Sequence, residues 1–296
     1  MRQSMNGVIN INKPQGMTSH DVVAKLRKIL NIKKVGHTGT LDPDATGVLP
    51  ICVGRATKAA DMLTASDKQY LAEVTLGSRT DTMDASGTVL ETAPVAVTKR
   101  QIEEAVQSFL GESEQLPPMY SAVKVGGRKL YELAREGKEV ARAPRRIRIS
   151  SIAVQSYAPA LDRFTMLVDC TKGTYIRTLC DDIGKALGCF AHMSALQRTR
   201  SGRFSIEDSV TIEQVAAAAE EGDFSFLTPV DRIFTEYPQI YLAQEKAQRV
   251  CCGARVKVAG LQDGAAYRVY DETGRFLTIS RQEQGSLKII KTFYQE

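Results

Sequence analysis

The chain has 296 residues, of which 43% are hydrophobic and 25% are charged, and its formal net charge is +5 at pH 7. This composition is ordinary for a globular protein, and the length suffices for one large domain and a small one. No run approaches the roughly 18 apolar residues that a membrane span needs, and the N-terminus lacks an apolar signal core, so we expect a cytoplasmic protein without a membrane partner. Six cysteines without a C-x-x-C pair, together with three scattered histidines, argue against a disulfide framework and against a metal site.

Three helices are predicted from their caps and apolar faces. Residues 18–30 begin at a capping residue, Thr18 or Ser19, and carry one apolar stripe. Capping boxes with the pattern T-x-x-Q open the other two helices, at positions 98 and 211, and a glycine ends each of them, at positions 111 and 222.

Strand patterns lie between these helices. Residues 70–77 and 163–170 alternate in hydrophobicity, as half-buried strands do. Their hairpin-like spacing favours antiparallel pairing over repeated βαβ units. We therefore predict an α+β fold with a mixed, largely antiparallel sheet and flanking helices.

The end of the chain has a pattern of its own. A helix-like stretch at 243–253 precedes two short strands around a turn at 271–274 and a third strand at 287–293. We therefore divide the chain into a large domain of residues 1–235 and a small β domain of residues 236–296.

Positive charge is concentrated in one segment. Residues 121–150 contain nine basic and three acidic side chains, an excess of +6 that is larger than that of the whole chain. A solvated charged face would account for many of them, but the run ARAPRRIRI has no compensating acid and favours a site for a polyanion.

The stretch GHTGTLDPDATGVLP at 36–50 places His37, Asp42 and Asp44 among three glycines and two prolines, a composition that excludes a helix. A calcium loop would lack its acidic ligand at position twelve, where Val53 stands. The DxDxT motif of aspartyl-phosphate phosphatases normally follows a buried hydrophobic strand, which GHTGT is not. An Asx-type turn capped by Asp42 and a lone catalytic carboxylate at Asp42 both fit the residues alone.

This loop resembles the catalytic motif of the TruB family of pseudouridine synthases, bacterial enzymes that isomerise a uridine in the T loop of tRNA. Further stretches resemble that family in the same order along the first 205 residues: NKPQGMTS (12–19), GRATK (54–58), KQYLAEVTLGSRTDTMDASG (68–87), QLPPMYSAVKVGGRKLYELAR (115–135) and GTYIRTLCDDIG (173–184). The resemblance implies a catalytic domain of the pseudouridine synthase type and conversion of the uridine at position 55 to pseudouridine without a cofactor. The residues from 236 onward resemble a PUA domain, a small RNA-binding β-barrel.

The resemblance also implies roles for single residues. Asp42 matches the catalytic carboxylate, and Arg177 matches the cation that faces it. Tyr70 matches a tyrosine that stacks on the flipped base, while Tyr175 and Leu196 complete the pocket. His37 matches a histidine that enters the RNA and fills the space that the flipped base leaves.

The basic segment corresponds to a family insertion at about 118–146, a flexible thumb that closes on RNA. Its expected contacts with the phosphates of a tRNA T-arm come from Lys124, Arg128, Lys129, Arg142, Arg145 and Arg146. No obligate protein partner is implied. An RNA-binding or folding-assistant protein with a vestigial loop is the competing hypothesis, and the joint presence of Asp42, Tyr70 and Arg177 favours the enzyme.

Overall fold

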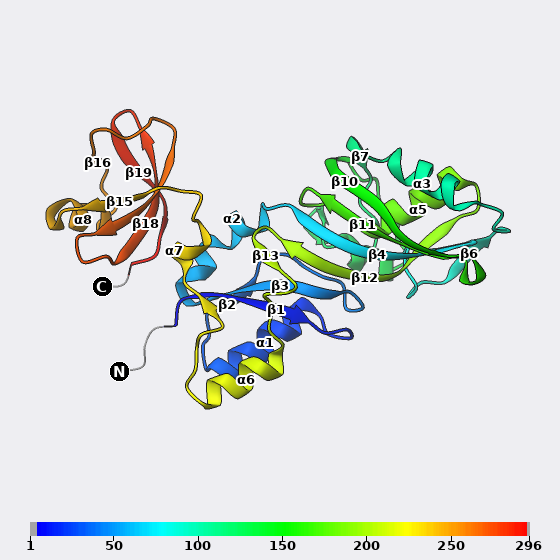
Figure 1. Cartoon of the computed structure of the whole chain (residues 1–296), viewed down its shortest axis with the longest axis horizontal. Coiled ribbons are helices and arrows are strands. Elements are labelled where there is room, and N and C mark those ends of the chain that lie inside the picture. Colours follow the sequence, from blue (N-terminus) through cyan, green and yellow to red (C-terminus); the bar gives the residue numbers. More distant parts are fainter. Residues whose placement is uncertain (1–4, 295–296) are drawn as a thin grey trace.

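The structure, a computed structural model, describes residues 5–294. Its centre is a ten-stranded mixed sheet (Figure 1). From edge to edge the path of this sheet runs through β14 (Leu227–Thr228), β1 (Gly7–Lys13), β3 (Thr46–Val53), β12 (Ala191–Ser201), β4 (Lys68–Leu76), β11 (Arg163–Cys170), β10 (Arg145–Ala158) and β7 (Gly111–Gln115). Two short strands lie off this path: β2 (Val35–His37) pairs with β3, and β13 (Phe204–Ser205) pairs with β12.

The predicted pairing is confirmed. Within this sheet β12 and β3 run parallel over a short contact, and the other pairings are antiparallel. The two predicted strands correspond to β4 and β11, which pair along their whole length. Separate two-stranded ribbons are formed by β5 (Ser78–Thr80) with β6 (Val89–Thr92) and by β8 (Lys124–Val125) with β9 (Arg128–Lys129).

Two pairs of helices cover different parts of the sheet. One pair packs near β1 and β3 and comprises α1 (Ser19–Leu30) and α6 (Ile212–Glu220); the other packs near β4, β10 and β12 and comprises α3 (Lys99–Gln107) and α5 (Ile176–Leu187). Each pair forms a core with the sheet, and Tyr70 and Leu196 contact both cores. The middle of the sheet therefore lies between two helical halves.

The two predicted capping boxes are present, and Thr18, one of the two candidate caps of the first helix, forms a third. Thr18, Thr98 and Thr211 each accept a hydrogen bond from the backbone three residues later, and in each box the side chain at that position accepts one in return. The second helix ends at Gln107, earlier than the predicted stop at Gly111, because residues 108–110 leave the helix before β7 begins.

Shorter helical turns, which the sequence analysis did not predict, connect the longer elements. They are η1 (Gly54–Ala59), α2 (Ala60–Thr64), α4 (Leu130–Arg135), η2 (Pro159–Leu161) and α7 (Val230–Ile233).

The C-terminal part forms a five-stranded sheet at one end of the elongated molecule (Figure 1). Its order is β15 (Gln239–Leu242), β17 (Ala266–Asp271), β18 (Phe276–Glu283), β19 (Ser286–Thr292) and β16 (Val256–Lys257), with α8 (Gln244–Cys251) packed against it. The predicted helix, turn and third strand are confirmed. Among the residues that the structure describes, the strand pairings form a row without a pairing between β15 and β16, so they do not show the closed barrel that we expected.

This sheet shares a hydrophobic core with the large domain. Ile279 of β18 and Phe293, which directly follows β19, belong to one buried cluster with Val48, Ala59 and Leu63 of the large domain. An ion pair of 2.8 Å joins Lys291 to Asp61 across the same junction. The boundary that the sequence suggested at residues 235 and 236 therefore runs through a packed interface.

Four cysteines, Cys52, Cys170, Cys180 and Cys189, are buried, and none of these four takes part in a disulfide bond among the described residues. No helix within residues 5–294 is long and apolar enough to cross a membrane.

Candidate active site

The loop that carries Asp42 connects β2 to β3 and is fixed by hydrogen bonds along its length. The backbone N–H of Thr38 donates to the carbonyl of Pro50 at 3.1 Å. The N–H of Leu41 donates to the hydroxyl of Ser19 at 2.9 Å. The N–H of Ala45 donates to the carbonyl of Asp42 itself at 3.1 Å, which closes a turn. The carboxylate of Asp42 therefore projects from a backbone held on both sides.

Lys13 anchors the same loop from β1. Its side chain is fully buried, and its ammonium group donates to the carbonyls of Pro14, Met17 and Pro43 at 2.6–3.0 Å. Burial lowers the pKa of Lys13 to about 8, against the attraction of Asp44 and Asp42. Because its partners are backbone carbonyls, this lysine positions the loop rather than pairing with a single acid.

Asp42 faces the guanidinium of Arg177, as expected. The Arg177 Nη2 atom lies 3.1 Å from Asp42 Oδ2, and Nη1 lies 3.5 Å from Oδ2 of a second carboxylate, Asp84. Arg177 is the second residue of α5 and is 7% exposed. Asp84 is held in turn by the hydroxyls of Thr82 and Ser86. One buried arginine thus lies between two oriented carboxylates.

The pKa of Asp42 is raised above its ordinary value. Burial is the main cause, and the negative charge of Asp84 adds to it, while Arg177 and Lys13 oppose it. The side chain of Asp42 is nevertheless 43% exposed to solvent, because it lines an open cleft. A ligand that filled this cleft would complete its desolvation.

The cleft has a volume of about 1090 Å³ and collects most of the predicted pocket residues. Asp42, Tyr70, Tyr175, Arg177 and Leu196 all line it. They come from the β2–β3 loop, β4, the N-terminus of α5 and β12, and so from segments that are distant in the sequence.

His37 lies at the end of β2 and does not line this cleft. Its ring is 5.5 Å from that of His20, and its Nδ1 atom is 3.4 Å from the backbone N–H of Gly39. Burial lowers the pKa of His37.

The basic thumb, at about 118–146, contains β8, β9 and α4 and reaches into the start of β10. Two of the six predicted RNA-binding residues, Lys124 and Arg145, line the cleft. Others contact the protein itself: Arg128 forms an ion pair with Glu136, Lys129 lies over the ring of Tyr131, and Arg142 donates to Pro117 and Glu139. Arg146 is exposed at the start of β10, opposite Glu114 on β7.

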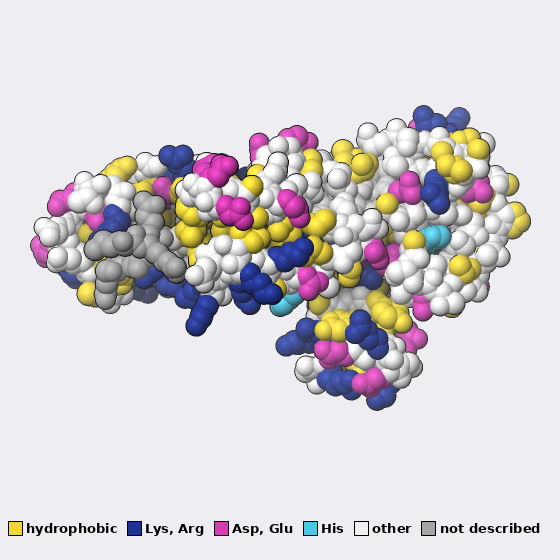
Figure 2. Space-filling model, turned by 90° about the horizontal axis from the view of Figure 1, so that it is seen from below, with side chains coloured by type: hydrophobic (Ala, Val, Ile, Leu, Met, Phe, Trp, Pro, Cys, Tyr) yellow, Lys and Arg dark blue, Asp and Glu magenta, His cyan; other side chains and the backbone are white. Residues whose placement is uncertain are grey.

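A second basic surface follows α1. Seen from the side of α1 and α6, Lys and Arg side chains gather near the middle of the molecule (Figure 2). The exposed basic residues of α1 and the loop after it are Lys25, Arg27, Lys28, Lys33 and Lys34. The sequence analysis missed this surface because these residues alternate with the apolar stripe of the helix.

The sequence analysis also missed Lys13, Asp84 and Arg198 as site residues. Two of them stand inside stretches that it quoted, NKPQGMTS and KQYLAEVTLGSRTDTMDASG, so a signal was present. Arg198 lies on β12, is 2% exposed and lines the cleft floor.

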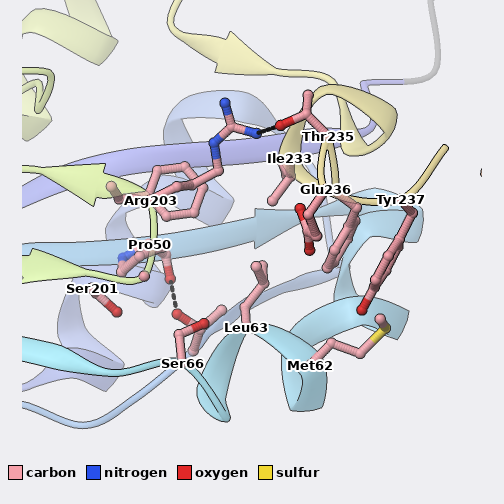
Figure 3. A pocket seen from close by; sticks show the side chains of 14 residues that line it. Pro50, Met62, Leu63, Ser66, Ser201, Arg203, Ile233, Thr235, Glu236 and Tyr237 are labelled. Atoms are coloured by element: carbon pink, nitrogen blue, oxygen red, sulfur yellow. Dashed lines mark hydrogen bonds between the residues drawn. The ribbon is translucent and has the colours of Figure 1, made fainter. Parts of the chain in front are cut away.

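A smaller hollow of about 460 Å³ lies between the large domain and the segment 233–237, which leads to the C-terminal sheet (Figure 3). Met62 and Leu63 of the large domain face Ile233 and Tyr237 of the connecting segment across it, and Arg203 donates to Thr235 at its rim. None of the predicted site residues lines this hollow.

No group of three or more His, Cys, Asp or Glu side chains within residues 5–294 is arranged to hold a metal ion.

The site pairs a carboxylate with a buried arginine, beside a tyrosine, in a cleft of a mixed sheet. Similarity to known proteins shows the class to which a chain with this site belongs. The chain belongs to the TruB family of pseudouridine synthases. Residues 27–176 match the TruB family pseudouridylate synthase (N terminal domain), residues 177–235 the tRNA pseudouridylate synthase B C-terminal domain, and residues 238–288 the domain described as pseudouridine synthase II TruB, C-terminal.

Individual relatives cover nearly the whole chain. It is 45% identical over 293 residues to the tRNA pseudouridine synthase B of Clostridium kluyveri. The match covers 98% of this chain and 100% of that protein. The tRNA pseudouridine synthase B of Bacillus anthracis is 45% identical over 298 residues, covering 97% of each chain.

Solved structures share the fold. A chain of an H/ACA RNP bound to a substrate RNA containing 2'-deoxyuridine has a TM-score of 0.72 at 26% identity, covering 98% of this chain and 85% of that one. A chain of a Cbf5-Nop10-Gar1 complex has a TM-score of 0.73 at 28% identity, covering 97% and 85%.

Proposed function

We propose that this protein converts the uridine at position 55, in the T loop of tRNA, to pseudouridine, with Asp42 as the catalytic carboxylate and without a cofactor. The ion pair between Asp42 and Arg177, which both line the cleft, is the observation that carries the proposal. Family membership supports the reaction class, and relatives named for tRNA support the substrate.

The reaction breaks the bond between N1 of uracil and C1′ of the ribose and joins C1′ to C5. The proton on C5 leaves, and N1 gains a proton, so the reaction is an isomerisation without net oxidation. Asp42 acts by adding to C6, by attacking C1′ or by removing the 2′ proton, and each route needs the ionised carboxylate. Burial opposes that ionised form, and the positive charge of Arg177 favours it.

A uridine in a folded loop reaches Asp42 only when it turns out of its stack, at a cost of a few kcal/mol. We propose that Tyr70 offsets this cost by stacking on the uracil, which contributes about 1–3 kcal/mol per base. Tyr175 and Leu196 form the remaining wall of the same cleft. His37, which lies outside the cleft, inserts into the RNA where the base has left.

The phosphates of the T-arm are bound by basic residues around the cleft. Lys124 and Arg145 are the thumb residues that line it. We propose that the five-stranded C-terminal sheet is a PUA-like RNA-binding domain that adds affinity without taking part in the chemistry.

The two acids of the loop provide the test. Asp42→Asn keeps the size of the side chain and removes its charge, so we expect pseudouridine formation to fall by at least about 10³-fold, a loss on the scale of removing a nucleophile or base. Binding of the same RNA should persist, because phosphate and stacking contacts remain. Asp44→Asn is the matched control, since Asp44 is exposed, and its activity should stay within a few-fold of the parent.

Both variants are assayed by tritium release from 5-tritiated uridine in a tRNA transcript, with RNA affinity measured in parallel. Near-parental turnover of Asp42→Asn would show that Asp42 only caps a turn. RNA binding by a parent protein without turnover would favour the RNA-binding hypothesis instead.

A further inference from the structure

Arg198 combines deep burial with a positive charge in the middle of the sheet. It is one of the largest fully buried side chains of the described residues, and it lies on β12 two residues after Leu196, a residue of the cleft wall. Its guanidinium donates hydrogen bonds to backbone carbonyls. These carbonyls are neutral and do not compensate the charge of the arginine. The position of the buried guanidinium therefore depends on the geometry of its hydrogen bonds.

The contacts of Arg198 reach both ends of the catalytic loop. Its Nε atom donates to the carbonyl of Val48 at 2.6 Å, and Nη2 donates to the carbonyl of Gly39 at 3.3 Å. Gly39 precedes Asp42 by three residues and Val48 follows it by six. In the antiparallel pairing of β12 with β4, Arg198 lies directly opposite Tyr70, so the two side chains share one face of the sheet.

The other side chains that hydrogen-bond to the loop belong to the part of the molecule around β1 and α1. Lys13 belongs to β1, and Ser19 begins α1, so they hold Asp42 relative to the first helical half. Tyr70 belongs to β4, in the other half of the sheet. Arg198 is hydrogen-bonded on both sides of Asp42 and lies opposite Tyr70 in the strand pairing, and it therefore links the carboxylate to the ring that faces the same cleft.

We infer that Arg198 is a positioning residue that sets Asp42 relative to Tyr70. The inference about turnover rests on the proposed function, whereas the inference about the loop does not. The planar guanidinium presents donors on several edges, and this fork reaches two carbonyls on different segments together. A lysine has three donors on one atom and does not reach partners on different segments in the same way.

The first experiment measures hydrogen exchange of the free protein. Arg198→Met keeps the bulk of the side chain and removes its donors, so amide exchange over residues 38–48 should accelerate while α1 stays protected. Arg200→Met is the matched control on the same strand, because Arg200 pairs with Asp169 away from the loop. Unchanged exchange of residues 38–48 in Arg198→Met overturns the inference, whatever the protein's activity.

The second experiment measures turnover on a T-arm RNA. Arg198→Met should lower kcat by about 10²-fold, the effect of a displacement near 1 Å, with KM within about threefold of the parent. Arg198→Lys should also stay at least about tenfold below the parent, whereas Arg200→Met should remain within about threefold. Full activity of Arg198→Lys would mean that charge suffices and would overturn the positioning role.

Should Arg198→Met fail to fold, Arg198→Lys decides both experiments, because it retains the buried charge. A parent protein without turnover would refute the proposed function, while the exchange experiment would still decide whether Arg198 holds the loop.

Discussion

Single charges around Asp42 act in opposite directions, and their balance sets the pH range in which the carboxylate is ionised. Burial and Asp84 raise the pKa of Asp42, and Arg177 lowers it. Arg177 also faces Asp84 at 3.5 Å, so its charge is shared between two acids. The site therefore keeps the pKa of Asp42 above its ordinary value, although the guanidinium of Arg177 lies 3.1 Å from the carboxylate.

This balance predicts opposite pH shifts for two variants. Ionised Asp42 is present above its pKa, so activity falls as the pH drops through that value. Arg177→Met removes the cation and should move the acid limb of the kcat/KM profile to higher pH. Asp84→Asn removes a like charge and frees Arg177, so it should move the limb to lower pH.

The measurement is the midpoint of the acid limb for the parent and the two variants, whatever their absolute rates. A shift of both variants in the same direction would contradict the electrostatic account of this site.

At the scale of elements, β3 and β12 approach each other closely, and a glycine makes this approach possible. Gly47 has a φ of +97°, and a Cβ atom built on it would lie 2.3 Å from the carbonyl oxygen of Arg198. Such a distance forces the backbone of one strand to move. The parallel contact of the two strands, on which the loop and Leu196 depend, requires glycine here.

Gly47→Ala should therefore lower the free energy of unfolding by more than the unfavourable positive φ alone would. Gly111 is the matched control, because its φ is +105° and no atom lies within 4 Å of an added Cβ. We expect Gly111→Ala to lower the free energy of unfolding by about 1–2 kcal/mol. Gly47→Ala should lower it by a further ~1–3 kcal/mol, the range for overpacking. Urea denaturation measures both, and equal losses would refute the steric account.

The thumb has its own prediction. Arg145 lines the cleft and Arg146 is exposed beside it, so the pair should contribute affinity that does not depend on RNA sequence. Changing both to Ala should reduce the slope of log K against log salt by up to about 2, at roughly 0.9 or less for each phosphate contact. Turnover at saturating RNA should change little.

The affinity is measured at several salt concentrations for modified and unmodified T-arm RNA. Arg128→Ala serves as a comparison, because Arg128 is already paired with Glu136 and should alter the slope less. An unaltered slope in the double variant would exclude these two arginines from phosphate binding.

At the scale of the whole molecule, the large domain and the C-terminal sheet share one buried cluster. Aromatic rings continue it into the sheet, where Phe276 stacks on Phe293 with centroids 5.2 Å apart. Because this cluster is buried only when both parts are folded, we expect them to unfold in one cooperative transition.

Phe293→Ala tests this coupling. Removal of a buried phenyl ring typically costs about 3–5 kcal/mol, so the single transition of the full chain should move to lower temperature. Tyr241→Ala is the control in the same sheet, since Tyr241 is 61% exposed, and it should change the transition little. Calorimetry that resolves two transitions, with only one moved by Phe293→Ala, would show that the parts fold independently.

Local signals in the sequence determined much of this fold. The capping boxes at Thr18, Thr98 and Thr211 and the alternation of residues 163–170 depend on neighbours within a few positions, and the structure contains all of them. The ion pair of Asp42 with Arg177 was also anticipated, because two separate stretches resembled one family.

Tertiary structure alone decided the rest. The sequence does not reveal that Arg198 bonds Val48, 150 positions away, or that a C-terminal phenylalanine completes the core of the large domain. It also did not separate Lys124 and Arg145, which reach the cleft, from Arg128, which pairs with Glu136. The identity of a charged residue in the sequence does not tell whether its side chain is solvated, paired or buried. Packing between distant segments decides which of these environments it has.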